Sequence, residues 1–291
     1  MSERIAVRFD EGWRRAVPAE WIASWGPERF ELEGGWTEVA AMGEGPPVLL
    51  LPPLPGYKES WIRVAPLLAA RFRVVTFDLR RRFSGHPSWD QLVRDLDRIV
   101  EHYAPGRVGV VGHSLGGALA QRWAAAHPDR VAALVLSSTF ERLENPPSHW
   151  WIRYGEQPLV LATQRLLPRG LALPIARALA RNGAWVYDRH CDEAVLDLVR
   201  HGIRTLPIGD AYTAVRLAFA HDGDTRNGPR PPTLVMVGER ESAVALRASR
   251  RLAEALGAEL AVLPDANHLH PLSRPDAFAG IAGDWLARHL R

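Results

Sequence analysis

The sequence is poor in two residues that mark particular kinds of protein. It has one cysteine, Cys191, and one lysine, Lys58, among 291 residues. A single cysteine excludes an intramolecular disulfide and a cysteine-rich metal site, and it suits a reducing compartment. No stretch approaches the roughly 18 to 20 consecutive apolar residues of a membrane span, and residues 1–5 lead into no secretory apolar run. We therefore expect a cytoplasmic protein without a membrane span.

The basic residues are almost all arginine, but they do not form a nucleic-acid surface. The formal net charge is only +3, and the arginines are scattered among acidic residues. The densest cluster, residues 80–82, follows an expected strand and has no aromatic residues interleaved with it. The sequence predicts no nucleic-acid partner.

Length and composition fit a globular domain. Hydrophobic residues make up 47% of the chain and charged residues 24%, which is ordinary for a soluble protein. A chain of 291 residues is long enough for one large core, or for a core that carries a smaller inserted domain.

One stretch combines a strand, a tight turn and a helix. Residues 108–111 are a valine-rich run typical of a strand buried on both faces. The motif Gly-x-Ser-x-Gly follows at once, with Ser114 between Gly112 and Gly116. Residues 118–126 are strong helix formers. This context places the serine hydroxyl at the carboxyl edge of a sheet, in front of a helix N-terminus that favours negative charge.

The stretch resembles the nucleophile elbow of the α/β-hydrolase fold, and the likeness extends from about residue 28 to the end of the chain. The resemblance implies an α/β fold with a doubly wound, mostly parallel sheet. It also implies a catalytic triad in the chain order serine, acid, histidine.

The remaining elements agree with such a sheet, because strand-like and helix-like segments alternate. Residues 29–40 read as a hairpin. Further strands are expected at 48–51, 73–77, 132–137, 233–237 and 259–263, and helices at 61–70, 89–103, 243–256 and 276–289.

The alternation stops between residues 145 and 228, where the chain reads as helices rich in leucine, alanine, arginine and aromatic residues. In the family, an insertion at this point is a helical lid over the nucleophile. We therefore expect a core of residues 1–144 and 229–291 with a lid of residues 145–228. A plain helical bundle that only completes the core is the alternative.

A serine nucleophile needs a base to take its proton. His268 lies just beyond the last expected strand, where the family places its histidine, and it is the expected base. His270, two residues later, is the competitor.

The acid is expected to be Glu241. The segment from Gly238 to Glu241 follows a strand where the family usually has Gly-x-x-Asp, so a glutamate stands in place of the aspartate. A carboxylate of either kind can fix the histidine tautomer and stabilise the imidazolium. The alternatives are Glu239, Asp222 and Asp224.

The resemblance also implies an oxyanion hole made of two backbone N–H groups, those of Leu54 and Leu115. The loop that holds Leu54 departs from the family, because Pro52 and Pro53 stand where many relatives have His-Gly. Proline has no N–H to donate, but Leu54 keeps its own.

These residues predict a serine hydrolase that cleaves an ester-like bond of a small, largely apolar molecule, without cofactor or metal. Two alternatives stay open. One is a carbon–carbon bond hydrolase or lyase on the same fold, which Leu269 after the histidine disfavours, because the carbon–carbon hydrolases usually have tryptophan there. The other is a non-catalytic relative that binds a small ligand, which only the two prolines support.

Overall fold

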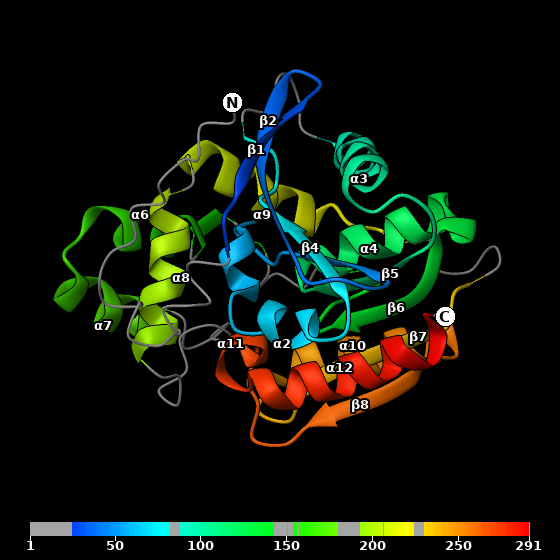
Figure 1. Cartoon of the computed structure of the whole chain (residues 1–291). Coiled ribbons are helices and arrows are strands. Elements are labelled where there is room, and N and C mark those ends of the chain that lie inside the picture. Colours follow the sequence, from blue (N-terminus) through cyan, green and yellow to red (C-terminus); the bar gives the residue numbers. More distant parts are fainter. Residues whose placement is uncertain are drawn as a thin grey trace.

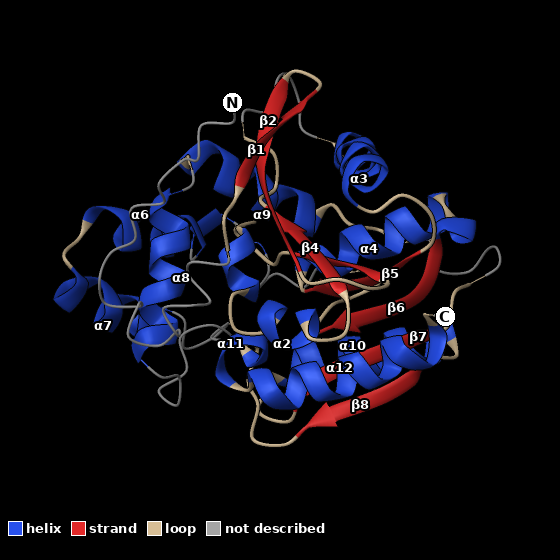
Figure 2. Ribbon diagram, viewed as in Figure 1, coloured by secondary structure: helices blue, strands red, loops and turns tan. Residues whose placement is uncertain are grey.

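The computed structural model describes residues 25–81, 88–142, 150, 154–155, 157–179, 193–205, 207–223 and 230–290. Its centre is an eight-stranded sheet in the order β1-β2-β4-β3-β5-β6-β7-β8 (Figures 1 and 2). Strands β1 and β2 pair antiparallel, as do β2 and β4, and every other pair is parallel. The expected mostly parallel α/β sheet is confirmed. The strands are β1 (Glu28–Leu32), β2 (Gly35–Met42), β3 (Pro47–Leu51), β4 (Arg73–Phe77), β5 (Val108–His113), β6 (Val131–Ser137), β7 (Thr233–Gly238) and β8 (Glu259–Leu263).

Helices cover both faces of this sheet, so it is doubly wound. The cluster of buried side chains on one face includes residues of α2, α11 and α12. The cluster on the other face includes residues of α3, α4 and α10. Outside residues 145–228, the helices of the described residues are η2 (Lys58–Trp61, 3-10), α2 (Ala65–Ala69), α3 (Trp89–Tyr103), α4 (Leu115–Ala126), η3 (Pro128–Arg130, 3-10), α10 (Ala243–Leu256), α11 (His270–Ser273) and α12 (Pro275–His289).

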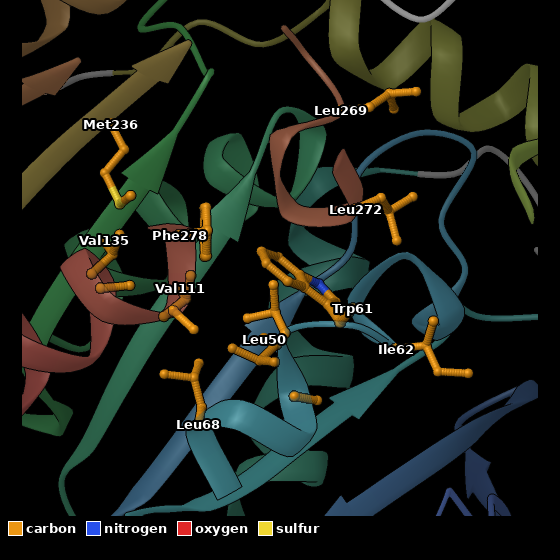
Figure 3. Close-up of a cluster of buried hydrophobic side chains, with 14 of the residues drawn as sticks. Leu50, Trp61, Ile62, Leu68, Val111, Val135, Met236, Leu269, Leu272 and Phe278 are labelled. Atoms are coloured by element: carbon orange, nitrogen blue, oxygen red, sulfur yellow. The ribbon is translucent and has the colours of Figure 1, made fainter. Parts of the chain in front are cut away.

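The valine and leucine runs lie in the central strands because both faces of those strands are buried. Along β3, Val48 and Leu50 belong to one cluster, whereas Leu49 and Leu51 belong to the other. Side chains alternate between the faces of a strand, so a continuous apolar run serves both cores. Figure 3 shows the first of these clusters.

The helix expected at residues 61–70 is shorter than the sequence indicated. A 3-10 helix covers Lys58–Trp61, and the α-helix begins only at Ala65, with Pro66 in its first turn. Proline is favoured there because its missing N–H has no partner inside the helix. The apolar residues from Trp61 onward therefore reflect the burial of this segment and do not form one continuous helix.

In the described part of the chain between β6 and β7 there are four helices, namely α6 (Gln157–Leu166), α7 (Arg169–Leu179), α8 (Glu193–Thr205) and α9 (Ile208–Phe219). In Figure 1, α6, α7 and α8 lie together on one side of the sheet (left in the view). The chain enters and leaves this region through adjacent segments. Arg142 pairs with Asp222 in an antiparallel bridge, and the N–H of Gly223 donates to the carbonyl of Glu141 at 2.9 Å.

Two arginines of the cluster, Arg80 and Arg81, form ion pairs within the protein. Arg80 is 2% exposed and forms two hydrogen bonds with the carboxylate of Asp95, at 2.7 and 2.8 Å. Arg81 lies 2.7 Å from Asp78, and Arg82 falls outside the described residues. Among the helices of the described residues, none is long and apolar enough to cross a membrane.

Candidate active site

Ser114 occupies a strained turn between β5 and α4. Its φ of 53° and ψ of −116° lie in a region that residues with a Cβ rarely adopt. The N–H of Ser114 donates to the carbonyl of Ser137 at 2.8 Å, and the hydroxyl of Thr139 donates to the carbonyl of Ser114 at 2.7 Å. These bonds to the end of β6 hold the turn from both sides.

The two glycines of the motif are required by close backbone approaches. A Cβ on Gly112 would lie 2.4 Å from the carbonyl oxygen of Gly116. A Cβ on Gly116 would lie 2.1 Å from the carbonyl oxygen of Leu51 and 2.8 Å from that of Pro52. The second approach brings the loop after β3 against the first turn of α4.

Glu241 and His268 lie in contact at the carboxyl ends of β7 and β8. Glu241 follows β7 and His268 follows β8, and Oε2 of the carboxylate lies 3.0 Å from Nδ1 of the imidazole. Both side chains are buried. Burial would raise the pKa of the Glu241 carboxyl, but the charge of His268 and its hydrogen bond hold that pKa below the usual value. The carboxylate is therefore ionised at neutral pH.

The other carboxylate oxygen of Glu241 has a partner that the sequence reasoning missed. Ser138, directly after β6, donates a short hydrogen bond from its hydroxyl to Oε1. Its φ is 45°, so the turn after β6 is also strained. The order of the strands could have indicated this contact, because β6 and β7 are parallel neighbours and the residues that follow them lie at the same edge of the sheet.

The alternative acids lie elsewhere. Glu239 is exposed and accepts the N–H of Asp265 at 3.0 Å. Asp222 is 74% exposed and lies beside Arg142. Asp224 falls outside the described residues.

His270, the alternative base, has other hydrogen-bond partners. Its Nε2 lies 2.6 Å from the hydroxyl of Ser137 and its Nδ1 lies 2.8 Å from the carbonyl of Asn267. Its nearest distance to Glu241 is 3.8 Å, longer than that of His268. Burial lowers the pKa of His270 to about 4, although Glu241 opposes the shift. It is a neutral side chain inside the fold.

The two expected oxyanion donors lie on adjoining segments. Leu115 is the first residue of α4 and Leu54 lies in the loop after β3, which Gly116 contacts. Within the described residues, the N–H of neither leucine has a hydrogen-bond acceptor. Both N–H groups are therefore free to donate a hydrogen bond.

A buried cluster of charges fixes the far end of the same loop. Lys58, 1% exposed, places its ammonium 2.6 Å from Glu38, 2.9 Å from Glu59 and 3.5 Å from Asp78. Burial would lower the pKa of this ammonium, but the carboxylates of Asp78, Glu59 and Glu38 raise it above its usual range. The backbone N–H of Lys58 also donates to Asp78 at 2.8 Å, which ties the loop to the end of β4.

Known proteins are similar to this chain over most of its length. The family model described as alpha/beta hydrolase fold matches residues 46–275. The pimeloyl-[acyl-carrier protein] methyl ester esterase of Chromobacterium violaceum is 33% identical over 264 residues, which cover 87% of this chain and 97% of that protein. The putative carbamate hydrolase RutD of Variovorax paradoxus is 31% identical, over 86% of this chain and 95% of that protein.

Solved structures agree in fold. The enol-lactonase from Burkholderia xenovorans superposes with a TM-score of 0.71 at 23% identity, covering 89% of this chain and 99% of that one. A thermophilic esterase from Thermogutta terrifontis gives a TM-score of 0.70 at 23% identity, covering 91% and 99%. The chain therefore belongs to the alpha/beta hydrolase fold family and is a hydrolase of that family.

Proposed function

We propose that this hydrolase cleaves an ester-like bond of a small, largely apolar molecule through an acyl-enzyme on Ser114. The observation that carries the proposal is the buried contact between Glu241 and His268, at the edge of the sheet where the strained serine turn lies. His268 acts as the general base, Glu241 orients it, and the N–H groups of Leu54 and Leu115 form the oxyanion hole.

The direction of the proton transfer follows from the hydrogen bond. The ionised carboxylate of Glu241 can only accept, so Nδ1 of His268 carries the proton. In the neutral ring Nε2 is then unprotonated and takes the proton of the Ser114 hydroxyl as the hydroxyl attacks the carbonyl carbon. His268 returns that proton to the leaving alcohol, and water then hydrolyses the acyl-enzyme by the same route.

The glutamate in place of aspartate fits this role. A side chain with one extra methylene has more freedom, and Ser138 removes that freedom by binding the oxygen that His268 does not use. The carboxylate therefore keeps one oxygen for each partner, which supports its assignment as the acid.

Apolar side chains around the site favour an apolar substrate. Leu269, beside the base, belongs to the same buried cluster as Leu196 and Val199 of α8, and Leu54 packs against that cluster. A Cβ on Gly202 of α8 would lie 2.5 Å from the ring of Tyr57. Helix α8 therefore packs closely against the residues that follow the candidate oxyanion loop.

We propose that residues 145–228, which include α6 to α9, act as a lid over Ser114. The contact of α8 with Tyr57 and the paired entry and exit at Arg142 and Asp222 support this division of the chain. We also propose that the protein acts in the cytoplasm, because a sequence with the single cysteine Cys191 suits a reducing compartment. Cys191 itself lies outside the described part of the chain.

A fluorophosphonate probe tests the nucleophile, because only an activated serine reacts with it. We expect the wild-type protein to be labelled and Ser114→Ala to stay unlabelled. A panel of p-nitrophenyl esters of graded chain length then defines the acyl group, with a vinylogous 1,5-diketone as the probe for carbon–carbon hydrolysis. If the wild-type protein is labelled but turns over only the diketone and none of the esters, the proposed ester hydrolysis is wrong and the protein is a carbon–carbon bond hydrolase. An unlabelled wild-type protein would leave only the non-catalytic, ligand-binding alternative.

A further inference from the structure

Beside the candidate triad lies a second, fully buried set of polar groups that the proposed reaction does not use. The hydroxyl of Ser137, the last residue of β6, lies 3.1 Å from Nδ1 of His113 and 2.6 Å from Nε2 of His270. Nδ1 of His270 lies 2.8 Å from the carbonyl oxygen of Asn267. Four residues from three separate loops or strand ends are thus joined by consecutive hydrogen bonds.

The proton positions along these bonds can be assigned from the Asn267 end. A carbonyl oxygen only accepts, so Nδ1 of His270 donates to Asn267. His270 is neutral, as burial keeps its pKa low, and its Nε2 therefore accepts the hydroxyl proton of Ser137. The serine has one proton to donate, so its oxygen accepts from Nδ1 of His113. All the bonds point the same way, from His113 to Asn267.

Both ends of the chain of bonds adjoin the candidate catalytic residues. His113 directly precedes Ser114, and the carbonyl of Ser137 accepts the N–H of Ser114 at 2.8 Å. Asn267 directly precedes His268, and the ring of His113 lies 5.0 Å from the ring of His268. The bonds therefore connect the turn that carries the nucleophile to the loop that carries the base.

The packing makes this connection rigid. His270 is completely buried and stacks on Phe278 of α12, with ring centroids 5.6 Å apart and an angle of 25° between the planes. Figure 3 shows Phe278 among the buried side chains near Val111 and Val135 of β5 and β6. A ring held on both edges and on one face has little freedom to move.

We propose that the hydrogen-bond chain from His113 through Ser137 and His270 to Asn267 positions His268 against Ser114, and that Ser137 and His270 are positioning residues of the reaction. The inference rests on the proposed function of Ser114 and His268. Glu241 fixes one nitrogen of the base, but the loop of the base also has to be held at the right distance from a turn on another strand. A misplacement of about 1 Å can cost roughly 10²-fold in rate.

The test uses Ser137→Ala and His270→Phe, singly and together. Ser137→Ala removes one oxygen, and His270→Phe keeps an aromatic ring on Phe278 without hydrogen bonds. The matched control is Ser249→Ala, which removes a buried hydroxyl of α10 that has no hydrogen-bond partner among the described residues. For each protein we would measure kcat and KM for p-nitrophenyl butyrate and the rate of labelling by the fluorophosphonate.

We expect each single variant to lose about 10- to 100-fold in kcat and in labelling rate, with KM little changed. The double variant should be no worse than the poorer single variant, because either change already interrupts the series of hydrogen bonds from His113 to Asn267. His270→Gln, whose amide oxygen can accept from Ser137, should recover part of the loss. Ser249→Ala should keep wild-type rates.

Labelling of Ser137→Ala at the wild-type rate would overturn the proposal, and this variant decides the matter even if His270→Phe does not fold. Losses that multiply in the double variant, or an equal loss in Ser249→Ala, would also overturn it in favour of a general packing effect. Failure of the wild-type protein to label would instead contradict the proposed function itself.

Discussion

Nδ1 of His268 lies 3.0 Å from Oε2 of Glu241, although the two residues follow different strands and are 27 positions apart. The remaining oxygen of Glu241 accepts from Ser138. A single carboxylate thus joins the ends of β6, β7 and β8 at the site.

Glu241→Gln should reduce kcat by about 10³- to 10⁴-fold, because an amide can hold the imidazole in the wrong tautomer and cannot stabilise the imidazolium. Glu241→Asp should keep more activity, but less than the wild type, since the shorter side chain cannot reach both His268 and Ser138. Glu239→Gln is the matched control, because that carboxylate is exposed and bound to the backbone of Asp265. Steady-state kinetics on a p-nitrophenyl ester would check all three, and equal losses at both positions would remove Glu241 from the triad.

Ser114→Ala and Ser114→Gly should both lose about 10⁴-fold or more in kcat, but they should differ in stability. The φ of 53° strains any residue with a Cβ. Glycine relieves that strain, so Ser114→Gly should be more stable than Ser114→Ala by about 1 kcal/mol. Urea unfolding of the two inactive variants measures the difference. Equal stability would mean that the turn stores no strain.

His268→Ala should be about as damaging to kcat as Ser114→Ala, and the double variant little worse, because nucleophile and base act as a unit. His270→Ala should cost far less, since His270 contacts Ser137 and Asn267 and not the reacting atoms. If His270→Ala proves the more damaging of the two histidine variants, the base has been assigned two residues too early.

Lys58→Met should destabilise the protein by about 3 to 5 kcal/mol, because it leaves three carboxylates near one another without the ammonium that holds them. Arg29→Met is the control, since it breaks an exposed ion pair with Glu31, in which the two side chains are 48% and 68% exposed. The control should cost less than about 1 kcal/mol. Urea unfolding at one pH compares the two, and similar costs would show that the buried cluster contributes no more than a surface pair.

The protein should lose stability in mild acid because it buries neutral histidines. Burial lowers the pKa of His270 to about 4, and burial together with Arg122 lowers the pKa of His221 to about 3. An imidazole in the unfolded chain takes up a proton below pH of about 6.5. The unfolded state therefore binds more protons between pH 6.5 and these lower values, and the free energy of unfolding falls as the pH drops through that window.

His221→Asn tests this acid effect. An asparagine oxygen can still accept the bond from Arg122, but the side chain has no proton to take up. The loss of unfolding free energy between pH 7.5 and pH 5.0 should be smaller than in the wild-type protein by about 2 kcal/mol. Ser249→Ala, which removes no titratable group, should keep the wild-type loss. An unchanged loss in His221→Asn would show that His221 is protonated in the folded protein.

The sequence by itself was sufficient for the features that depend on neighbouring residues. The strand–turn–helix at Ser114 could be predicted because valines, glycines and helix formers act over a few positions. The bounds of α3, α10 and β8 agree with the expected ranges because apolar residues recur at the period of each element. The expected helix after Trp61 failed at its start, where apolar spacing alone does not distinguish a buried 3-10 turn from an α-helix.

Only the tertiary structure decided which distant side chains meet. His268 and His270 are two positions apart, and only the resemblance to the family favoured His268 as the base. The loop after β8 turns into α11 at His270, which directs one ring to Glu241 and the other to Ser137. The same holds for Ser138 on Glu241 and for Lys58 among its carboxylates. Such contacts depend on the order of the strands and on the path of each loop across the sheet edge, and these are set by the packing of the whole core.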